Sequence, residues 1–308
     1  MKKIFIDGKA GTTGLRIEER LSGRDDLEIV SLPDELRKDT AARKEIINSS
    51  DIVFLCLPDA AAIEAVSLIE NENVTVIDAS TAHRTNPAWA YGFPELGEDF
   101  EEKIRNSTRI ANPGCHASGF IALVYPLIKA GLLPKDALLT AHSITGYSGG
   151  GKKMIADYES DEKDPLLFAP RQYGITQNHK HLPEMTAITG LENAPVFSPI
   201  VSDFYSGMEV TVPLFRSQLN GGIEEIKNIY KASYNSPIMK YEEADDEGGF
   251  LSAAKYSGKD SMGISVYGND ERIILVARYD NLGKGASGAA VECLNIKLGC
   301  DKAKMLEI

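Results

Sequence analysis

The strongest constraint on the fold is the alternation of strand and helix signals in the first third of the chain. We expect strands at residues 3–6, 27–30, 51–57 and 74–77, and helices at residues 15–21, 41–48 and 60–71. Such alternation is typical of a doubly wound α/β fold, in which helices cover both faces of a parallel sheet. Ligands of these sheets bind outside the carboxyl ends of the strands. We therefore expect functional residues at positions 8–14, 58–60 and 78–84.

The pattern changes beyond about residue 116. A helix is expected at residues 117–129, followed by a strand at residues 138–144 that leads into a glycine-rich stretch. Further strands with stronger alternation of apolar and polar residues are expected at residues 208–214, 263–267 and 272–278. This pattern indicates a mixed or antiparallel sheet in a second domain. Residues 240–249 are acidic and predict a solvated loop, and residues 285–298 predict an apolar, alanine-rich helix.

The charge and the cysteines exclude several classes of function. The 45 acidic residues outnumber the 33 basic ones and give a net charge of −12, which argues against nucleic acid and anionic membranes as partners. No apolar run reaches the length of a membrane span, and the chain opens on a strand rather than a signal peptide, so we expect a cytoplasmic protein. The four cysteines have neither C-x-x-C nor zinc spacing, so no metal is expected. Cys56, Cys293 and Cys300 are expected to be packing residues, with Cys56 buried in the core.

Gly8, Gly11 and Gly14 form a G-x-x-G-x-x-G pattern between the first expected strand and the first expected helix. Glycines let the backbone approach a pyrophosphate, whose charge is met by the amides and dipole of the helix N-terminus. Plain strand–helix turns can carry the same pattern. Its place between a strand and a helix favours a dinucleotide site.

The residues after the second strand bear on the choice of dinucleotide. An NAD site usually places an acidic residue there to bind the ribose 2′-hydroxyl. Here acidic residues appear only at Asp34 and Glu35, and Arg37 and Lys38 follow closely. Ser31 and the basic pair suit a 2′-phosphate, so we expect NADP.

Cys115 has the setting of a nucleophile. It follows Asn112, Pro113 and Gly114 at the start of an expected helix. The dipole and free amides of a helix N-terminus favour a thiolate, and the same amides can stabilise an oxyanion on an attacked carbonyl. The alternative is a core cysteine at a helix start, which the polar, turn-rich flanks disfavour.

A nucleophilic cysteine requires a base, and two histidines are close together in the sequence. His83, His116 and His142 stand singly, whereas His179 and His181 form an H-x-H pair. Without a third ligand the pair does not indicate a metal site, and in an extended segment both side chains would point to one side. We expect one to be the general base and acid and the other to orient or contact the substrate. The alternative is a surface loop with two incidental histidines.

Five segments together resemble the N-acetyl-gamma-glutamyl-phosphate reductase family, in the shorter of its two forms. They are Asn-Pro-Gly-Cys at residues 112–115, Tyr-Gly-Phe-Pro-Glu-Leu at 91–96, the glycine-rich stretch 143–152, the segment around His179 and His181, and Asn-Leu-Gly-Lys-Gly-Ala at 281–286. The resemblance covers nearly the whole chain, in order. Residues 8–14 and 78–84 depart from the motifs of the longer form, which affects the details of cofactor and phosphate contacts rather than the reaction class.

The resemblance implies an enzyme of arginine biosynthesis. It would reduce N-acetyl-glutamyl 5-phosphate, an acyl phosphate, to N-acetyl-glutamate 5-semialdehyde with NADPH, through a thioester on Cys115. The implied architecture is a Rossmann domain of residues 1–115 and 285–308, which the C-terminal helix completes. Residues 116–284 would form an α+β catalytic and oligomerisation domain like that of glyceraldehyde-3-phosphate and aspartate-semialdehyde dehydrogenases. The family also implies a homodimer or homotetramer.

The resemblance and the motifs together assign site residues. The expected catalytic residues are Cys115, His179 and His181. The expected cofactor contacts are Gly8, Gly11, Thr12, Thr13, Gly14, Ser31, Arg37, Ser80, Asn281, Gly283 and Lys284, with Asn281 at the nicotinamide end. Arg84, Arg109 and Lys152 are the candidates for substrate phosphate or carboxylate, and each could instead be a surface ion pair.

Two other functions are compatible with these residues. One is a related acyl-phosphate reductase, acting on the N-acetyl-aminoadipyl homologue or as an aspartate-semialdehyde dehydrogenase, and a panel of substrates would distinguish it. The other is a non-catalytic dinucleotide sensor, which would have no use for a thiolate at Cys115.

Overall fold

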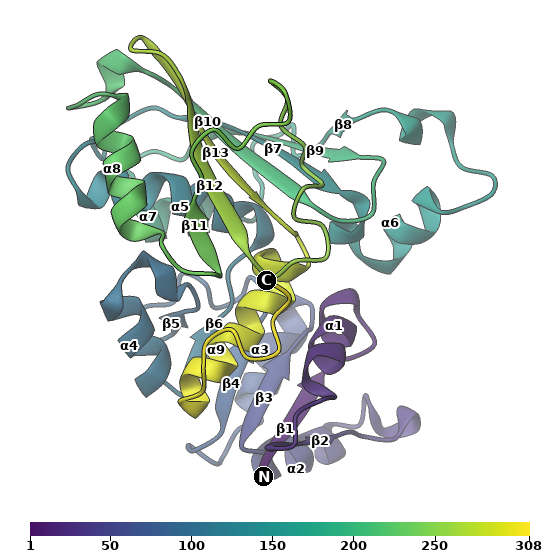
Figure 1. The fold of residues 1–308 in the computed structure, drawn as a ribbon. Helices are drawn as coiled ribbons and strands as arrows, with labels where there is room; N and C mark the ends of the chain where they lie inside the picture. Colours follow the sequence, from purple (N-terminus) through teal and green to yellow (C-terminus); the bar gives the residue numbers. More distant parts are fainter. The chain divides into compact units, whose positions relative to one another are not determined.

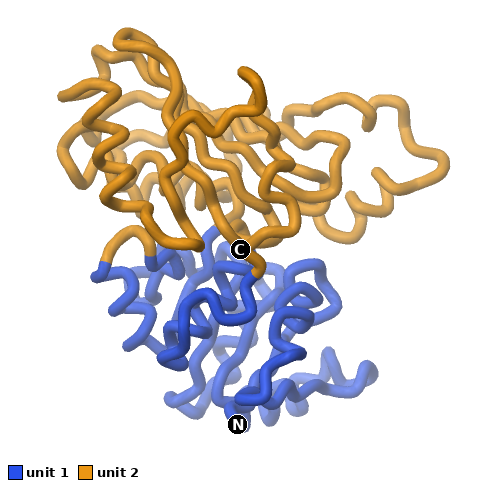
Figure 2. Tube along the Cα trace, in the orientation of Figure 1, with its two compact units in different colours: residues 1–94, 98–113, 286–306 blue, residues 95–97, 114–285, 307–308 orange.

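The computed structural model describes residues 1–308, which form two compact units (Figure 2). Unit 1 comprises residues 1–94, 98–113 and 286–306, and unit 2 comprises residues 95–97, 114–285 and 307–308. Relative to the ranges expected from the sequence, unit 2 also contains Gly114, Cys115, Gly285, residues 95–97 and residues 307–308. The long segment of unit 2, residues 114–285, is therefore preceded and followed in the chain by segments of unit 1. Unit 1 is assembled from segments far apart in sequence.

Unit 1 contains a six-stranded sheet in which every neighbouring pair is parallel (Figure 1). Its strands are β1 (Lys2–Asp7), β2 (Leu27–Val30), β3 (Ile52–Leu55), β4 (Thr75–Asp78), β5 (Ala90–Tyr91) and β6 (Arg109–Ala111). They lie in the order β2-β1-β3-β4-β6-β5. The central strands are apolar on both sides, as expected for a parallel sheet covered on both faces.

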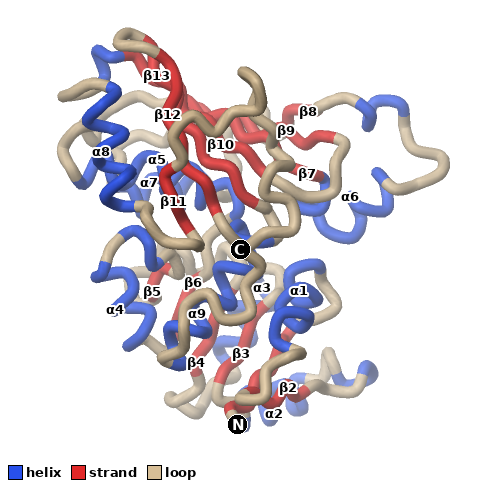
Figure 3. Tube along the Cα trace, viewed as in Figure 1, coloured by secondary structure: helices blue, strands red, loops and turns tan.

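Five helices cover the two faces of this sheet (Figure 3). They are α1 (Thr12–Leu21), α2 (Thr40–Ser49), α3 (Asp59–Ser67), α4 (Glu98–Asn106) and α9 (Gly288–Leu298). Ile4 and Phe54 point into a core shared with α1, α4 and α9. Phe5 and Val53, one position along each strand, point into a second core shared with α2 and α3. Because successive side chains of a strand point to opposite faces, this division confirms the doubly wound α/β expectation.

Unit 2 contains a seven-stranded mixed sheet. Its strands are β7 (Thr140–Gly146), β8 (Arg171–Gln172), β9 (Val196–Ser202), β10 (Met208–Phe215), β11 (Met239–Tyr241), β12 (Met262–Gly268) and β13 (Arg272–Tyr279). They lie in the order β11-β12-β13-β10-β7-β9-β8, with parallel pairing only between β11 and β12 and between β7 and β9. The mixed sheet predicted for the second domain is confirmed.

Helix α5 (Cys115–Lys129) is the most buried helix of unit 2 and contacts β10, β13, α7 and α8. The other helices are α6 (Gly151–Tyr158), α7 (Leu182–Thr189) and α8 (Ile223–Ser233). Pro126 has no N–H to give to the carbonyl of Ala122, and the Tyr234 hydroxyl donates to that carbonyl at 2.6 Å instead. A Cβ at Gly119 would lie 2.6 Å from Val210, so only glycine allows β10 to pack this closely. The start of α5 is thus held firmly against the sheet.

Three expectations are corrected by the structure. Residues 240–249 are not wholly a solvated loop, because β11 extends to Tyr241 and the carboxylates of Asp245 and Glu247 pair with the buried guanidinium of Arg278. Cys56 is only partly buried and lines a cavity rather than the middle of the core. The C-terminal helix begins with a π-helical turn, Gly283–Ser287, before α9.

Candidate active site

Cys115 is the first residue of α5, and contacts within unit 2 fix its backbone on both sides. The preceding amide, that of Gly114, donates to Glu184 Oε1 at 2.8 Å, and Glu184 is buried on α7. The Tyr279 hydroxyl donates to the carbonyl of Cys115 at 2.5 Å and accepts from the amide of Gly119 at 3.0 Å. No side chain caps the helix. A helix N-terminus without a capping side chain favours negative charge at its first residue, which here is Cys115.

His179 and His181 lie together with a third histidine, His116. The ring centroids of His179 and His181 are 4.8 Å apart, and each is 5.6 Å from that of His116. The expectation of an extended H-x-H segment is wrong, because His179 begins a turn in which its carbonyl accepts from the amide of Leu182 at 3.0 Å. This turn leads into α7. The turn, and not the alternation of side chains along a strand, brings the two rings together.

His179 has a defined hydrogen-bonding state. Its Nδ1 accepts from the backbone amide of His181 at 3.2 Å, which leaves the ring hydrogen on Nε2 in the neutral form. Burial and then the charge of Lys180 lower the pKa of His179 below its ordinary value. Neutral His179 can thus donate a hydrogen bond through Nε2, and its Nδ1 is occupied.

Sequence reasoning missed two residues of this cluster, His116 and Tyr173. The His116 ring is buried, and its nitrogens lie 2.6 Å from the hydroxyl of Ser143 and 2.6 Å from that of Tyr173. Burial lowers the pKa of His116 to about 3, followed by the effects of His179 and Lys180. The place of His116 directly after Cys115 was an available signal. Nothing in the sequence marked Tyr173, which lies 57 residues away.

The glycine loop of unit 1 has the close packing that a dinucleotide cradle needs. Gly8 has φ +86°, and a Cβ there would lie 2.3 Å from the carbonyl oxygen of Cys56. A Cβ at Gly14 would lie 2.6 Å from the Cα of Lys9. A cavity of about 180 Å³ adjoins the start of α1, which no side chain caps. It is lined by Gly11, Thr12, Thr13, Gly14, Cys56, Leu57 and Ala79. Free amides beside an open cavity fit a pyrophosphate.

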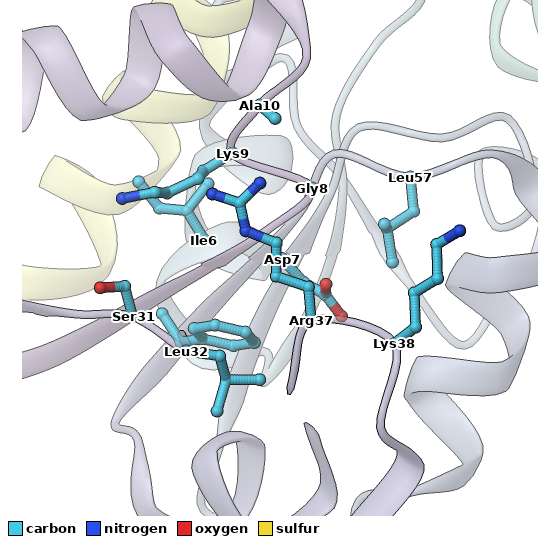
Figure 4. Close-up of a pocket in the computed structure, with 11 residues that line it drawn as sticks. Ile6, Asp7, Gly8, Lys9, Ala10, Ser31, Leu32, Arg37, Lys38 and Leu57 are labelled. Atoms are coloured by element: carbon cyan, nitrogen blue, oxygen red, sulfur yellow. The ribbon is translucent and has the colours of Figure 1, made fainter. Parts of the chain in front are cut away.

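A second cavity, of about 210 Å³, lies between the ends of β1 and β2 and the residues after β2 (Figure 4). It is lined by Phe5, Ile6, Asp7, Gly8, Lys9, Ala10, Ser31, Leu32, Arg37, Lys38 and Leu57. Asp7 is the only acidic residue among them, and its carboxylate is paired with Arg43 at 2.9 Å. Lys9, Arg37 and Lys38 and the Ser31 hydroxyl also line the cavity, where Lys9 pairs with Glu18 at 3.1 Å and Arg37 pairs with Asp34 at 2.6 Å.

The remaining candidates of unit 1 have structural partners. Ser80 is buried and its hydroxyl donates to Asp78 at 2.7 Å. Arg84 donates to the carbonyls of Asn112 and Ala79 at 2.9 and 3.0 Å, at the carboxyl end of the sheet. Arg109 is the first residue of β6 and donates to the carbonyls of Val74 and Thr108. It therefore lies at the amino-terminal end of the parallel strands, whereas the glycine loop lies at their carboxyl-terminal end.

The remaining candidates of unit 2 are divided between buried and exposed positions. Asn281 is buried, donates to the Ser148 hydroxyl at 3.0 Å and accepts from the Gly207 amide at 2.9 Å. The Lys284 ammonium is buried against Glu95 at 2.7 Å. A Cβ at Gly283 would lie 1.9 Å from the Lys259 carbonyl oxygen, so this position packs backbone against backbone. Lys152 is exposed on α6. No group of three or more His, Cys, Asp or Glu side chains is placed to hold a metal ion.

Two family models match the chain. The model described as semialdehyde dehydrogenase, NAD binding domain, matches residues 13–106, and that described as semialdehyde dehydrogenase, dimerisation domain, matches residues 115–281. The chain thus has a domain that binds a nicotinamide dinucleotide and a domain of a dimerising type. No helix here combines the length and apolar character needed to cross a membrane.

Curated relatives share nearly half of the sequence. Proteins called N-acetyl-gamma-glutamyl-phosphate reductase are 45% identical in Sinorhizobium medicae, 46% in Mesorhizobium japonicum and 47% in a Chelativorans strain. Each match covers 96% of this chain and at least 98% of the relative.

Solved structures of aspartate semialdehyde dehydrogenases share the fold at low identity. The Vibrio cholerae enzyme II matches with a TM-score of 0.73 at 16% identity, over 97% of this chain and 99% of that one. The Francisella tularensis enzyme matches with a TM-score of 0.73 at 15% identity, over 96% and 99% of the two chains. With relatives at this level of identity over their whole length, the chain belongs to the N-acetyl-gamma-glutamyl-phosphate reductase family.

Proposed function

We propose that this chain catalyses the NADPH-dependent reduction of N-acetyl-L-glutamyl 5-phosphate to N-acetyl-L-glutamate 5-semialdehyde and phosphate, the third step of arginine biosynthesis. The observation that carries the proposal is the placement of Cys115 at the uncapped start of α5, in the unit that also holds the cluster of His116, His179 and His181. A thiol at a helix N-terminus is favoured as thiolate and is a strong nucleophile.

The reaction follows from that placement. The Cys115 thiolate attacks the acyl carbon, the bond to the phosphate oxygen breaks, and a thioester remains on the sulfur. A bound nicotinamide dinucleotide supplies the hydride that reduces this thioester. The first-turn amides of α5 stabilise the negative oxygen formed in the attack and again in the reduced thiohemiacetal. Cleavage of its carbon–sulfur bond then releases the aldehyde and regenerates the thiolate.

The two histidines of the H-x-H pair take different roles in this proposal. His179 acts as a hydrogen-bond donor to the substrate through Nε2, because its Nδ1 is occupied by the amide of His181. His181 is then the general base that accepts the Cys115 proton before the attack. It returns that proton to the sulfur after the carbon–sulfur bond of the thiohemiacetal has broken.

The cofactor is proposed to be NADP rather than NAD. Lys9, Arg37 and Lys38 surround the second cavity with Ser31, and the only carboxylate there, Asp7, is neutralised by Arg43. Gly8, Gly11 and Gly14 would hold the pyrophosphate with Thr12 and Thr13 at the start of α1. Arg84 and exposed Lys152 remain the candidates for the substrate anion, and Arg109 is left out because of its place at the opposite edge of the sheet. The working form is proposed to be a homodimer or homotetramer in the cytoplasm.

The test is the reverse reaction, followed as NADPH absorbance. Purified protein is given NADP, phosphate and, in separate assays, N-acetyl-glutamate semialdehyde, its aminoadipate homologue and aspartate semialdehyde. We expect kcat/KM to be at least tenfold higher for N-acetyl-glutamate semialdehyde than for the others. A preference for another aldehyde would assign a different acyl-phosphate reductase, and binding of NADP without turnover of any aldehyde would assign a sensor.

A further inference from the structure

We propose that Tyr279 is a positioning residue, whose hydroxyl holds the peptide unit between Cys115 and His116 so that the N–H of this unit stays directed at the negative oxygen of the reacting substrate. Tyr279 is the last residue of β13 and is fully buried in unit 2. The inference rests on the proposed function and deepens it, because this oxygen forms when Cys115 attacks the substrate.

The Tyr279 hydroxyl bridges the first turn of α5. A carbonyl oxygen can only accept and an amide N–H can only donate, so the hydroxyl donates to the Cys115 carbonyl at 2.5 Å and accepts from the Gly119 amide at 3.0 Å. These are the two groups that a regular helix pairs directly, because residue 119 follows residue 115 by four positions. Burial and then the charge of Cys115 raise the pKa of Tyr279 well above its ordinary value, so the hydroxyl keeps its hydrogen.

Two glycines leave room for the Tyr279 ring beside Cys115. A Cβ at Gly119 would lie 2.7 Å from the Tyr279 oxygen, so a larger residue there would displace the hydroxyl from the helix. A Cβ at Gly285 would lie 3.3 Å from the Cε2 atom of the ring and 3.1 Å from the Cβ of Cys115. The ring is therefore enclosed on both sides by backbone, and its hydroxyl has one place against the first turn of α5.

The bond to the Cys115 carbonyl also fixes a second group, because a peptide unit is planar. The carbonyl of Cys115 and the N–H of His116 belong to one rigid plane and point in opposite directions. In a helix that N–H points toward the N-terminal end, and a first-turn amide has no acceptor within the helix. A donor that is held in place before the reaction stabilises an oxyanion without the cost of reorientation. Tyr279 holds the His116 amide in this way.

Tyr230 provides the matched control for an experiment on Tyr279. It is fully buried as well, and its hydroxyl donates at 2.5 Å to the Leu123 carbonyl of the same helix. Leu123 lies about two turns along α5 from Cys115. Tyr230→Phe therefore removes the same kind of bond from α5, but from a peptide unit remote from the reacting sulfur.

The experiment compares the full-length wild type with Tyr279→Phe and Tyr230→Phe in the reverse reaction, using the aldehyde that the wild type prefers. In Tyr279→Phe we expect kcat to fall about tenfold at an unchanged KM, because the lost contact acts only on the transition state. This loss is smaller than the loss of about a hundredfold or more that follows removal of an oxyanion donor itself. Tyr230→Phe should keep the wild-type kcat.

Alkylation of Cys115 by iodoacetamide at pH 7, followed by mass spectrometry of its peptide, separates this role from a general loss of structure. Displacement of iodide by the thiolate forms no oxyanion, so Tyr279→Phe should be alkylated at the wild-type rate. An unchanged kcat, a parallel loss of kcat and alkylation rate, or failure of Tyr279→Phe alone to fold would each overturn the inference. If the wild type turned over no aldehyde, the proposed function itself would be refuted, and the inference would fall with it.

Discussion

Two helix N-termini carry the proposed chemistry, and they differ in their surroundings. The start of α1 in unit 1 adjoins an open cavity lined by small residues and has no capping side chain. The start of α5 in unit 2 also has no capping side chain, but buried hydroxyl, carboxylate and imidazole groups hold its backbone and surround its first residues.

The difference shows how one physical device serves two purposes. Aligned amides attract negative charge wherever they are free. An open N-terminus accepts that charge from a ligand, and glycine is the residue that lets the ligand approach. An enclosed N-terminus instead favours charge on the side chain of its first residue, here Cys115. The groups around that side chain then control its protonation.

Reductase activity should depend on Cys115 and not on Cys56. Cys115→Ala should lower kcat at least a thousandfold while NADPH binding, measured by fluorescence titration, persists. Cys56→Ala is the matched control, because burial of its sulfur, although the residue as a whole is partly exposed, and then the charges of Asp78 and Asp7 raise the pKa of Cys56 to about 12 and keep it a neutral thiol. Cys56 lines the cavity at α1, so its variant tests whether a cysteine at the open terminus has any chemical role. Turnover by Cys115→Ala at the wild-type rate would rule out the thioester.

Substitutions of His179 and of His181 should affect different kinetic constants. His181→Gln should lower kcat by about a hundredfold, the usual contribution of a general base. His179→Gln should mainly raise KM, because it removes a donor to the substrate and not the base. Steady-state assays at pH 7 measure both. If His179→Gln lost kcat and His181→Gln lost only KM, the roles would be reversed.

Burial of His116 should lower the free energy of unfolding in acid. Burial lowers the pKa of His116 to about 3 in the folded protein from its ordinary value of 6.5, so below pH 6.5 the unfolded chain takes up a proton that the folded chain does not. The free energy of unfolding therefore falls with pH between these values by about 1.4 kcal/mol per unit, and nothing is lost above pH 6.5.

Urea unfolding at pH 7 and pH 5 measures this dependence. His116→Gln should lose about 2 kcal/mol less than the wild type over that interval, from the same slope. His142→Gln, at an exposed position of β7, is the control and should follow the wild type. Equal losses in His116→Gln and wild type would mean that His116 takes up its proton at an ordinary pH.

The cavity lined by Ser31, Arg37 and Lys38 should determine the preference for NADPH over NADH. Arg37→Ala should weaken NADPH binding by about tenfold, the scale of one charge-assisted hydrogen bond to phosphate, and leave NADH binding unchanged. Fluorescence titration with both dinucleotides measures the ratio. Arg109→Ala, at the amino edge of the sheet, should alter neither. Equal weakening of both dinucleotides by Arg37→Ala would argue against a 2′-phosphate at this cavity.

The sequence predicted what depends on local pattern. The alternation of strands and helices predicted the parallel sheet, and the positions of Gly8 and Cys115 relative to expected strands and helices predicted two helix starts. The structure bears out the fold class, with Cys115 as the first residue of α5 and Gly8 directly after β1 in the loop that leads to α1.

The remainder depends on tertiary contacts that no local pattern encodes. Tyr173 meets His116 because β8 pairs with β9 and β9 with β7, which also carries Ser143. The rings of His179 and His181 meet through a turn, where alternation had suggested an extended segment. Arg109 was a candidate because it flanks the segment between a strand end and Cys115, but as the first residue of β6 it lies at the amino-terminal end of that strand.

The discontinuity of unit 1 has a consequence for biosynthesis. One face of its sheet is completed by Ala290, Val291 and Leu294 of α9, which pack against Ile4 and Phe54. A ribosome synthesises these residues only after residues 114–285, which belong to unit 2. Until then the nascent sheet exposes apolar surface that α9 will later cover, so the dinucleotide-binding unit can mature only after that stretch of unit 2 has been made. A transcript truncated before codon 286 would yield a product lacking this cover and prone to aggregation.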